Sequence, residues 1–375
     1  MQKFNIVPDI QNFEIPIRQI KEGCMNPKIK NMLWLMLKIL LALGIIGGMI
    51  YVKRADLEKA VHNINYLWIL PAVLLYAVHL LAGAWRWYLL LRGQKIMISF
   101  WKVLSLNMQG LFFTLTPLGF IGGDLAKAGF ISSHAEKGLK LKGVFTILID
   151  RILGMIALFT LVGIVGVLSI GFLRSLSGGF ELVLYAVIAA CIIAAVSVVI
   201  LFFHRTLEKI RILSLIINTC DKYSKGALHN LMKAMDEFKS QYKMLIFCIM
   251  ISIVLVHLNL ALILYLIGLG TGTENISFKL SALAMSIGNT AGTLPLTPSG
   301  FGTRDIVIQN ILSAGGIKEQ AALIPLILSC MILSFNLSGG LFFIFSRKKP
   351  KKEDREQRTD DRGWMTAYGR RNYSK

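Results

Sequence analysis

The segment LTPLGFIGGD at residues 115–124 returns as LTPSGFGTRD at residues 296–305, and this repetition organises the whole chain. Six of the ten positions are identical, in the pattern L-T-P-x-G-F-x-x-x-D, and the two copies are 181 residues apart. Proline and glycine interrupt helices, and a carboxylate is costly inside hydrocarbon. Two copies of such a segment in an apolar chain therefore need a structural or functional reason.

The rest of the 375-residue chain is apolar enough to be a membrane protein, with 55% hydrophobic residues and a mean hydropathy of +0.61. A helix needs about 20 apolar residues to cross a bilayer. Runs of that length occur at 33–52, 64–91, 144–170, 180–203, 244–269 and 319–346, and two more apolar stretches, 103–121 and 280–298, are interrupted by Pro and Gly. The sequence predicts an all-α polytopic membrane protein.

The net charge of +20 comes from Lys and Arg residues that lie mainly in the loops and tails flanking these runs. Positive-inside topology and anionic lipid headgroups account for such a distribution, and no nucleic-acid-binding motif accompanies it, so we expect no nucleic-acid partner. The five cysteines have no metal-binding or disulfide spacing, and residues 1–30 lack the order of a signal peptide. We expect neither a metal nor a cofactor.

Counting Lys and Arg between the apolar runs selects a topology. If all eight stretches cross the membrane from a cytoplasmic N-terminus, 21 basic residues lie inside and 17 outside; if the two interrupted stretches return to their own side, the numbers are 31 and 7. The positive-inside rule favours the second arrangement. It has about six full transmembrane helices and two re-entrant helical hairpins, at about 103–142 from the cytoplasm and about 280–318 from outside, with both termini cytoplasmic in a bacterial inner membrane.

The 181-residue offset also superimposes the neighbouring spans, so units of about 64–170 and 244–346 form an inverted repeat. Many secondary transporters are built in this way, with broken helices meeting near the midplane. Within the membrane domain at 33–346, residues 204–243 predict an amphipathic cytoplasmic linker. Residues 1–32 predict a cytoplasmic segment and 347–375 a disordered charged tail.

The Pro and Gly residues of the two repeated segments are interpreted as the tips of the hairpins. Irregular backbone at membrane depth persists only where protein buries it or where it lines a wet cavity. The predicted tip residues are Pro117, Gly119, Gly122 and Gly123 in the first hairpin, and Pro295, Pro298, Gly300 and Gly302 in the second.

Charged residues near these tips are the candidates for substrate binding or translocation, because a charge at membrane depth is costly. They are Asp124, Lys127, Asp150, Arg151, Arg304 and Asp305. In the functional interpretation, the lysine, the arginines and free helix N–H groups bind a phosphate. In the structural alternative, Asp124 and Asp305 cap helices that begin near Gly123 and Gly302, and Asp150–Arg151 is an interfacial ion pair.

Three other polar residues within the spans have a structural interpretation. Arg86 lies between Trp85 and Trp87, which indicates an aromatic-belt anchor with a snorkelling arginine. His79 and His257 lie on apolar helices and are interpreted as packed, helix-bridging residues, since no metal-binding or nucleophile motif accompanies them.

The motifs PLGFIGGDLAKAGF (117–130), DRILG (150–154) and PLTPSGFGTRD (295–305) together resemble the integral-membrane region of lysylphosphatidylglycerol synthases, which also occurs alone in flippase-like membrane proteins. The resemblance covers about residues 30–346. It implies movement of aminoacylated phosphatidylglycerol between leaflets, with amino-acid transfer left to a separate soluble domain that is not expected in this chain. The chain matches the family pattern at Gly122, Gly123, Asp124, Lys127, Asp150, Arg151, Gly154, Pro295, Pro298, Gly300 and Gly302. It departs from the pattern at Ser299 and Asp305.

The sequence therefore favours a flippase for an anionic or aminoacylated phospholipid, or for a polyprenyl-phosphate lipid, and assigns no catalytic residue. The alternative is a membrane transferase on lipid-linked substrates, such as phosphatidylglycerol lysyltransferase acting from lysyl-tRNA. A scaffold protein would leave the hairpin charges unexplained. The expected partners are membrane phospholipids or a lipid-linked intermediate. A separate lipid-modifying enzyme and a homo-oligomer remain open.

Overall fold

The computed structural model describes residues 64–116, 119–134, 139–175, 241–293, 300–318 and 320–345, with a few single positions between 185 and 238. All the regular structure in these ranges is helical, as the sequence predicts. The predicted segment 1–32, the span 33–52, the tail 347–375, and most of the span 180–203 and of the linker 204–243 lie outside the described residues.

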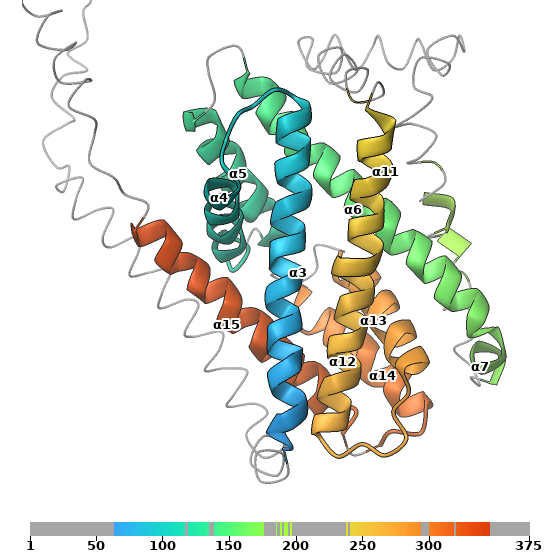
Figure 1. The fold of residues 1–375 in the computed structure, drawn as a ribbon. Helices are drawn as coiled ribbons and strands as arrows, with labels where there is room; N and C mark the ends of the chain where they lie inside the picture. The colour runs from blue at the N-terminus through green and yellow to red at the C-terminus, as the bar shows by residue number, and fades with distance from the viewer. Residues whose placement is uncertain are drawn as a thin grey trace, which may run out of the picture. The chain divides into compact units, whose positions relative to one another are not determined.

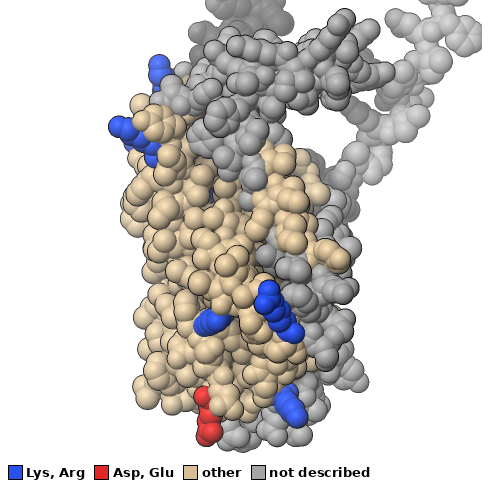
Figure 2. Space-filling model, turned by 90° about the vertical axis from the view of Figure 1, so that its right-hand side faces the viewer, with Lys and Arg blue, Asp and Glu red and all other residues tan. Residues whose placement is uncertain are grey.

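Four of the described helical segments are long and apolar enough to cross a membrane. They are α3 (Tyr66–Gly93), α6 (Lys140–Leu168), α15 (Leu323–Phe345), and a continuous segment of α11 (Tyr242–Ile251), the π-helix η2 (Ser252–Leu258) and α12 (Asn259–Gly270). These segments match the apolar runs predicted at 64–91, 144–170, 244–269 and 319–346. Figure 2 shows one face of the molecule, where uncharged residues cover most of the described surface.

Two helical hairpins lie between these long helices. The first hairpin is α4 (Phe100–Phe113) packed on α5 (Gly119–His134), and the second hairpin is α13 (Phe278–Gly292) packed on α14 (Thr303–Ala314). With 12 to 16 residues each, these helices are shorter than the roughly 20 residues that a crossing requires. A six-residue helix, α7 (Ile170–Ser175), follows α6.

Both hairpins begin in the same way. The triplet Ile-Ser-Phe stands at 98–100 and again at 276–278, immediately before and at the first residue of α4 and α13. The hydroxyl of Ser99 accepts a hydrogen bond from the N–H of Lys102 at 3.4 Å, and that of Ser277 accepts one from Leu280 at 3.2 Å. Each serine thus satisfies one N–H that would otherwise lack a partner, and this fixes the start of the helix.

The described helices fall into two halves with the same order and the same packing partners. In order, α3, α4, α5 and α6 correspond to α11–α12, α13, α14 and α15. The first helix of each hairpin packs against the last long helix of the other half, since α4 contacts α15 and α13 contacts α6. The second helix of each hairpin packs against the long helix of its own half, α5 on α6 and α14 on α15.

The first long helices of the two halves, α3 and α11–α12, run antiparallel. The N–H of Asn65 before α3 donates to the carbonyl of Gly270 at the end of α12 at 2.8 Å. At the other end, the side chain of Gln241 before α11 donates to the carbonyl of Gly93 at 2.9 Å. In Figure 1 the first hairpin lies toward the upper end of α3 and the second hairpin toward its lower end. The two halves therefore point in opposite directions.

The glycines of the two repeated segments have different positions. Gly122 and Gly123 lie inside α5 and not at a tip, which corrects the prediction for the first hairpin. A Cβ on Gly123 would lie 2.8 Å from the carbonyl oxygen of Gly110, so this glycine allows α5 to approach α4 closely. Gly300 and Gly302 have φ of +73° and +84° in the turn before α14, where a residue with a Cβ would be strained. Pro117, Pro295 and Pro298 lie outside the described residues.

Candidate functional site

The first hairpin is joined to α6 by an ion pair between Asp124 and Arg151. The guanidinium Nε donates to the two carboxylate oxygens at 3.1 and 2.8 Å, and Nη2 donates to Oδ1 at 2.7 Å. The exposed fractions are 42% for the Arg151 side chain and 24% for that of Asp124. Asp124 lies in the second turn of α5, which begins at Gly119, so the predicted capping role for this residue is wrong. It pairs with a cation on a neighbouring helix instead.

A second ion pair lies next to the first and is buried. Arg86 of α3 donates from Nε to Asp150 of α6 at 2.6 Å, and from Nη1 to the hydroxyl of Ser252 in η2 at 2.6 Å. The side chains of Arg86 and Asp150 are only 10% and 11% exposed. The predicted snorkelling role of Arg86 is therefore wrong, because its guanidinium lies between three helical segments.

The predicted pair between Asp150 and Arg151 does not form. Adjacent residues on an α-helix point about 100° apart, so they face different neighbours. Asp150 faces Arg86 on α3, and Arg151 faces Asp124 on α5. These two ion pairs connect three segments of the first half, α3, α5 and α6, and through Ser252 they reach the second half.

Lys127 of α5 completes this group and differs from the other cations. It is 9% exposed, its Nζ lies 5.2 Å from the centre of the Trp87 ring, and its aliphatic chain packs against Gly110. Among the described residues it makes no ion pair, although Asp124, Asp150, Arg86 and Arg151 are all near enough to interact with it electrostatically. We call Arg86, Asp124, Lys127, Asp150 and Arg151 the first cluster. It has three cations and two carboxylates.

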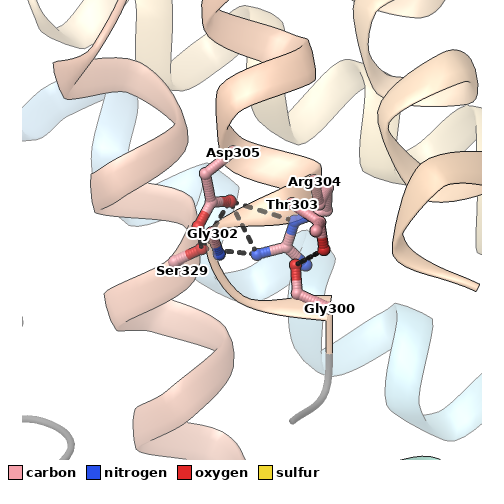
Figure 3. A network of polar contacts seen from close by, with 6 residues as sticks. All are labelled: Gly300, Gly302, Thr303, Arg304, Asp305 and Ser329. Carbon is pink, nitrogen blue, oxygen red and sulfur yellow. Dashed lines mark hydrogen bonds and ion pairs between the residues drawn. The ribbon is translucent and has the colours of Figure 1, made fainter. Parts of the chain in front are cut away.

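The second cluster consists of Arg304, Asp305 and Ser329, where the second hairpin meets α15 (Figure 3). The carboxylate of Asp305 accepts from the Arg304 guanidinium at 3.2 Å, from the Ser329 hydroxyl at 2.8 Å and from the N–H of Gly302 at 3.1 Å. The last bond caps the start of α14, as the structural alternative predicts for Asp305. Arg304 is 6% exposed and also contacts the Ser329 hydroxyl.

The two histidines join helices through backbone carbonyls, which agrees with the interpretation from sequence. The Nδ1 of His79 lies 3.3 Å from the carbonyl of Val256, and the Nε2 of His257 lies 3.1 Å from that of Gly154. Each imidazole must donate its proton there, since a carbonyl only accepts. The described part of the chain contains no group of three or more His, Cys, Asp or Glu side chains able to hold a metal ion.

Sequence reasoning missed Arg86, Ser252 and Ser329 as members of these clusters. A serine within a long apolar helix is a weak signal, because it is also an ordinary small packing residue. The tryptophans beside Arg86 suggested the membrane surface, but Trp87 is buried and donates from its indole to Thr146 at 3.0 Å. Only the packing of α3 on α6 and η2 reveals the role of Arg86.

Residues 35–334 match the family model described as the lysylphosphatidylglycerol synthase TM region. Over 122 residues the chain is 32% identical to a UPF0104 membrane protein of Pyrococcus horikoshii, an alignment that covers 32% of this chain and 36% of the relative. The match thus spans about a third of the length of that curated relative. No solved structure matches the chain.

Proposed function

This chain belongs to the family of the lysylphosphatidylglycerol synthase transmembrane region, and from this premise we propose that it moves an anionic or aminoacylated phospholipid between the leaflets of a membrane. In this proposal the first cluster binds the phosphate of the headgroup, and the acyl chains stay in the surrounding lipid. Phospholipids are then both the substrate and the solvent of the protein.

The observation that carries the proposal is that Lys127 is buried and makes no ion pair among the described residues. Burying a cation without a carboxylate of its own is costly, and proteins accept that cost mainly at functional sites. The two carboxylates of the first cluster are already paired with Arg86 and Arg151. A phosphate diester bound at Lys127 would supply the missing negative charge and bring the cluster to neutrality.

The two arginines of the first cluster suit different roles in this proposal. Arg151 is the more exposed of the two, and its planar guanidinium can form the same bidentate hydrogen bonds with a phosphate that it forms with Asp124. It could therefore exchange partners as the headgroup arrives. Arg86 is enclosed by Asp150 and Ser252 and would hold the three helices in place during this exchange.

The topology in our proposal has the two hairpins re-entering the membrane from opposite faces, the first from the cytoplasm and the second from outside. The short hairpin helices, the opposite directions of the two halves and the positive-inside count support this inverted repeat. The same count supports cytoplasmic termini in a bacterial inner membrane.

Reconstitution of the Lys127→Met variant tests the proposal. Full-length protein is inserted into phosphatidylcholine vesicles that carry acyl-labelled fluorescent phosphatidylglycerol, and the label that reaches the outer leaflet is quenched by dithionite. We expect Lys127→Met to slow movement at least about tenfold, since a charge-assisted contact contributes about 1.5–3 kcal/mol. The matched control is Lys140→Met, at the exposed start of α6.

Circular dichroism and gel filtration verify that both variants are folded. Wild-type rates in the folded Lys127→Met protein would refute the assignment of the site. A lipid extract separates transport from the transferase alternative. Cells without a transferase lose a lipid species altogether, whereas cells without a transporter keep its amount and change its leaflet.

A further inference from the structure

A cavity of about 210 Å³ lies where the second hairpin begins, beside the end of α6. It is lined by Ser169 and Phe172 from the end of α6 and from α7, by Asn275 from the loop before α13, and by Lys279 and Leu283 from α13. None of these residues belongs to either charged cluster. Ser169 stands 18 residues after Arg151, which corresponds to about 27 Å along a helix that rises 1.5 Å per residue.

The start of α13 places donor N–H groups and a positive charge beside this cavity. The hydroxyl of Ser277 accepts a hydrogen bond from the N–H of Leu280, but the N–H groups of Phe278 and Lys279 have no acceptor among the described residues. The 15-residue helix adds its dipole, and the exposed Lys279 adds a full charge in the first turn. Free N–H groups at such an end are a binding place for anions.

A buried hydroxyl in the lining of this cavity is an independent sign of a ligand. Ser169 is 1% exposed, and its Oγ has no hydrogen-bond partner in the part of the chain that the structure describes. Buried hydroxyl groups are almost always hydrogen-bonded, and the exceptions call for a missing partner. A ligand in this cavity that accepts a hydrogen bond would supply one.

The remaining walls define the chemical class of the ligand. Phe172, Leu280 and Leu283 are apolar, and no acidic residue is in the lining, since Glu274 lines a neighbouring cavity instead. The volume is below the range of about 300–1,000 Å³ that encloses a drug-sized ligand. The cavity therefore suits a compact anion attached to an apolar tail, and not a whole lipid.

We propose that this cavity binds the phosphate of a phospholipid headgroup, as a second site separate from the first cluster. Lys279 and the first N–H groups of α13 hold the phosphate oxygens, Ser169 donates its hydroxyl, and the apolar wall receives the start of the acyl chains. The distance of about 27 Å from Arg151 approaches the 30 Å thickness of the hydrocarbon core. The two sites then serve the two leaflets, and this leaflet assignment alone rests on the proposed function.

Binding to the purified full-length chain tests the second site. Dihexanoyl phosphatidylglycerol is titrated calorimetrically into protein in a neutral detergent, and inorganic phosphate is titrated in parallel. We expect two binding sites in the wild type. Lys279→Gln should raise the Kd of one site about tenfold, as expected for a lost charge-assisted hydrogen bond, and Lys127→Met should affect only the other. Lys140→Gln, which removes the same charge at the far end of α6, should leave both unchanged.

Ser169→Ala separates a binding role from a packing role. Removing an unsatisfied buried hydroxyl should raise the melting temperature of the ligand-free protein, and it should also raise the Kd about tenfold if the hydroxyl donates to the anionic phosphate. Higher stability with an unchanged Kd would overturn the assignment of Ser169. Lys279→Gln protein that binds like the wild type would overturn the site itself.

Two further comparisons complete the test. Tighter binding of the lipid than of inorganic phosphate supports a headgroup site, and equal affinity overturns the lipid assignment. If the wild type moves no lipid in the vesicle assay while Lys279→Gln loses binding, the proposed function fails and this site stands. If Lys127→Met abolishes transport while Lys279→Gln binds normally, the proposed function stands and this second site fails.

Discussion

Replacing Arg86 with methionine removes the cation of the buried ion pair and keeps most of the side-chain volume. Asp150 would then keep a charge in a site where its side chain is 11% exposed, without its hydrogen bond of 2.6 Å from the guanidinium. Breaking a buried pair by removing one partner costs about 3–5 kcal/mol, because the other charge stays buried and uncompensated. We expect a loss of unfolding free energy of that size.

The double variant Arg86→Met/Asp150→Leu should recover most of this loss. Replacing both members of a buried pair by apolar residues of similar volume is often neutral, because the cost of burying either charge also disappears. We expect the double variant to fall within about 1 kcal/mol of the wild type. The exposed pair is the internal comparison: Arg151→Met, with 42% exposure of the arginine, should cost about 1 kcal/mol or less.

The assay is reversible unfolding in mixed micelles with an increasing fraction of sodium dodecyl sulfate, followed by circular dichroism and by tryptophan fluorescence, to which the buried Trp87 contributes. Two results would contradict the reasoning. One is a loss below about 1 kcal/mol for Arg86→Met, and the other is a double variant as unstable as the sum of its single changes.

Two further predictions concern the packing and the second cluster. Gly339→Ala should destabilise the protein, because its Cβ would collide with the carbonyl oxygen of Met108, whereas Gly83→Ala, with no atom within 4 Å, should be neutral or slightly stabilising in the same unfolding assay. Asp305→Asn should lower the unfolding free energy by about 1.5–3 kcal/mol, since it weakens charge-assisted bonds to the buried Arg304; an unchanged midpoint would show that these bonds contribute little.

Local signals in the sequence identified the long helices and the start of α14. Four apolar runs predicted spans that the structure contains, because about 20 consecutive apolar residues are recognisable without knowledge of any neighbour. The capping role of Asp305 was also accessible, since a cap acts on N–H groups within its own first turn. The same reasoning failed for Asp124, because α5 begins four residues earlier than the glycine pair suggests.

The sequence by itself determined that this is a helical membrane protein with a repeated pair of interrupted segments and charged residues beside them. Only the tertiary structure decided which polar side chains meet: Arg86 with Asp150 across 64 residues, Arg151 with Asp124 across 27, and Arg304 with Ser329 across 25. The physical reason is that hydropathy and capping depend on neighbours along the chain. An ion pair between helices depends on the rotation and height at which those helices pack. That same packing leaves Lys127 without a carboxylate of its own, which no pattern in the repeated segments could reveal.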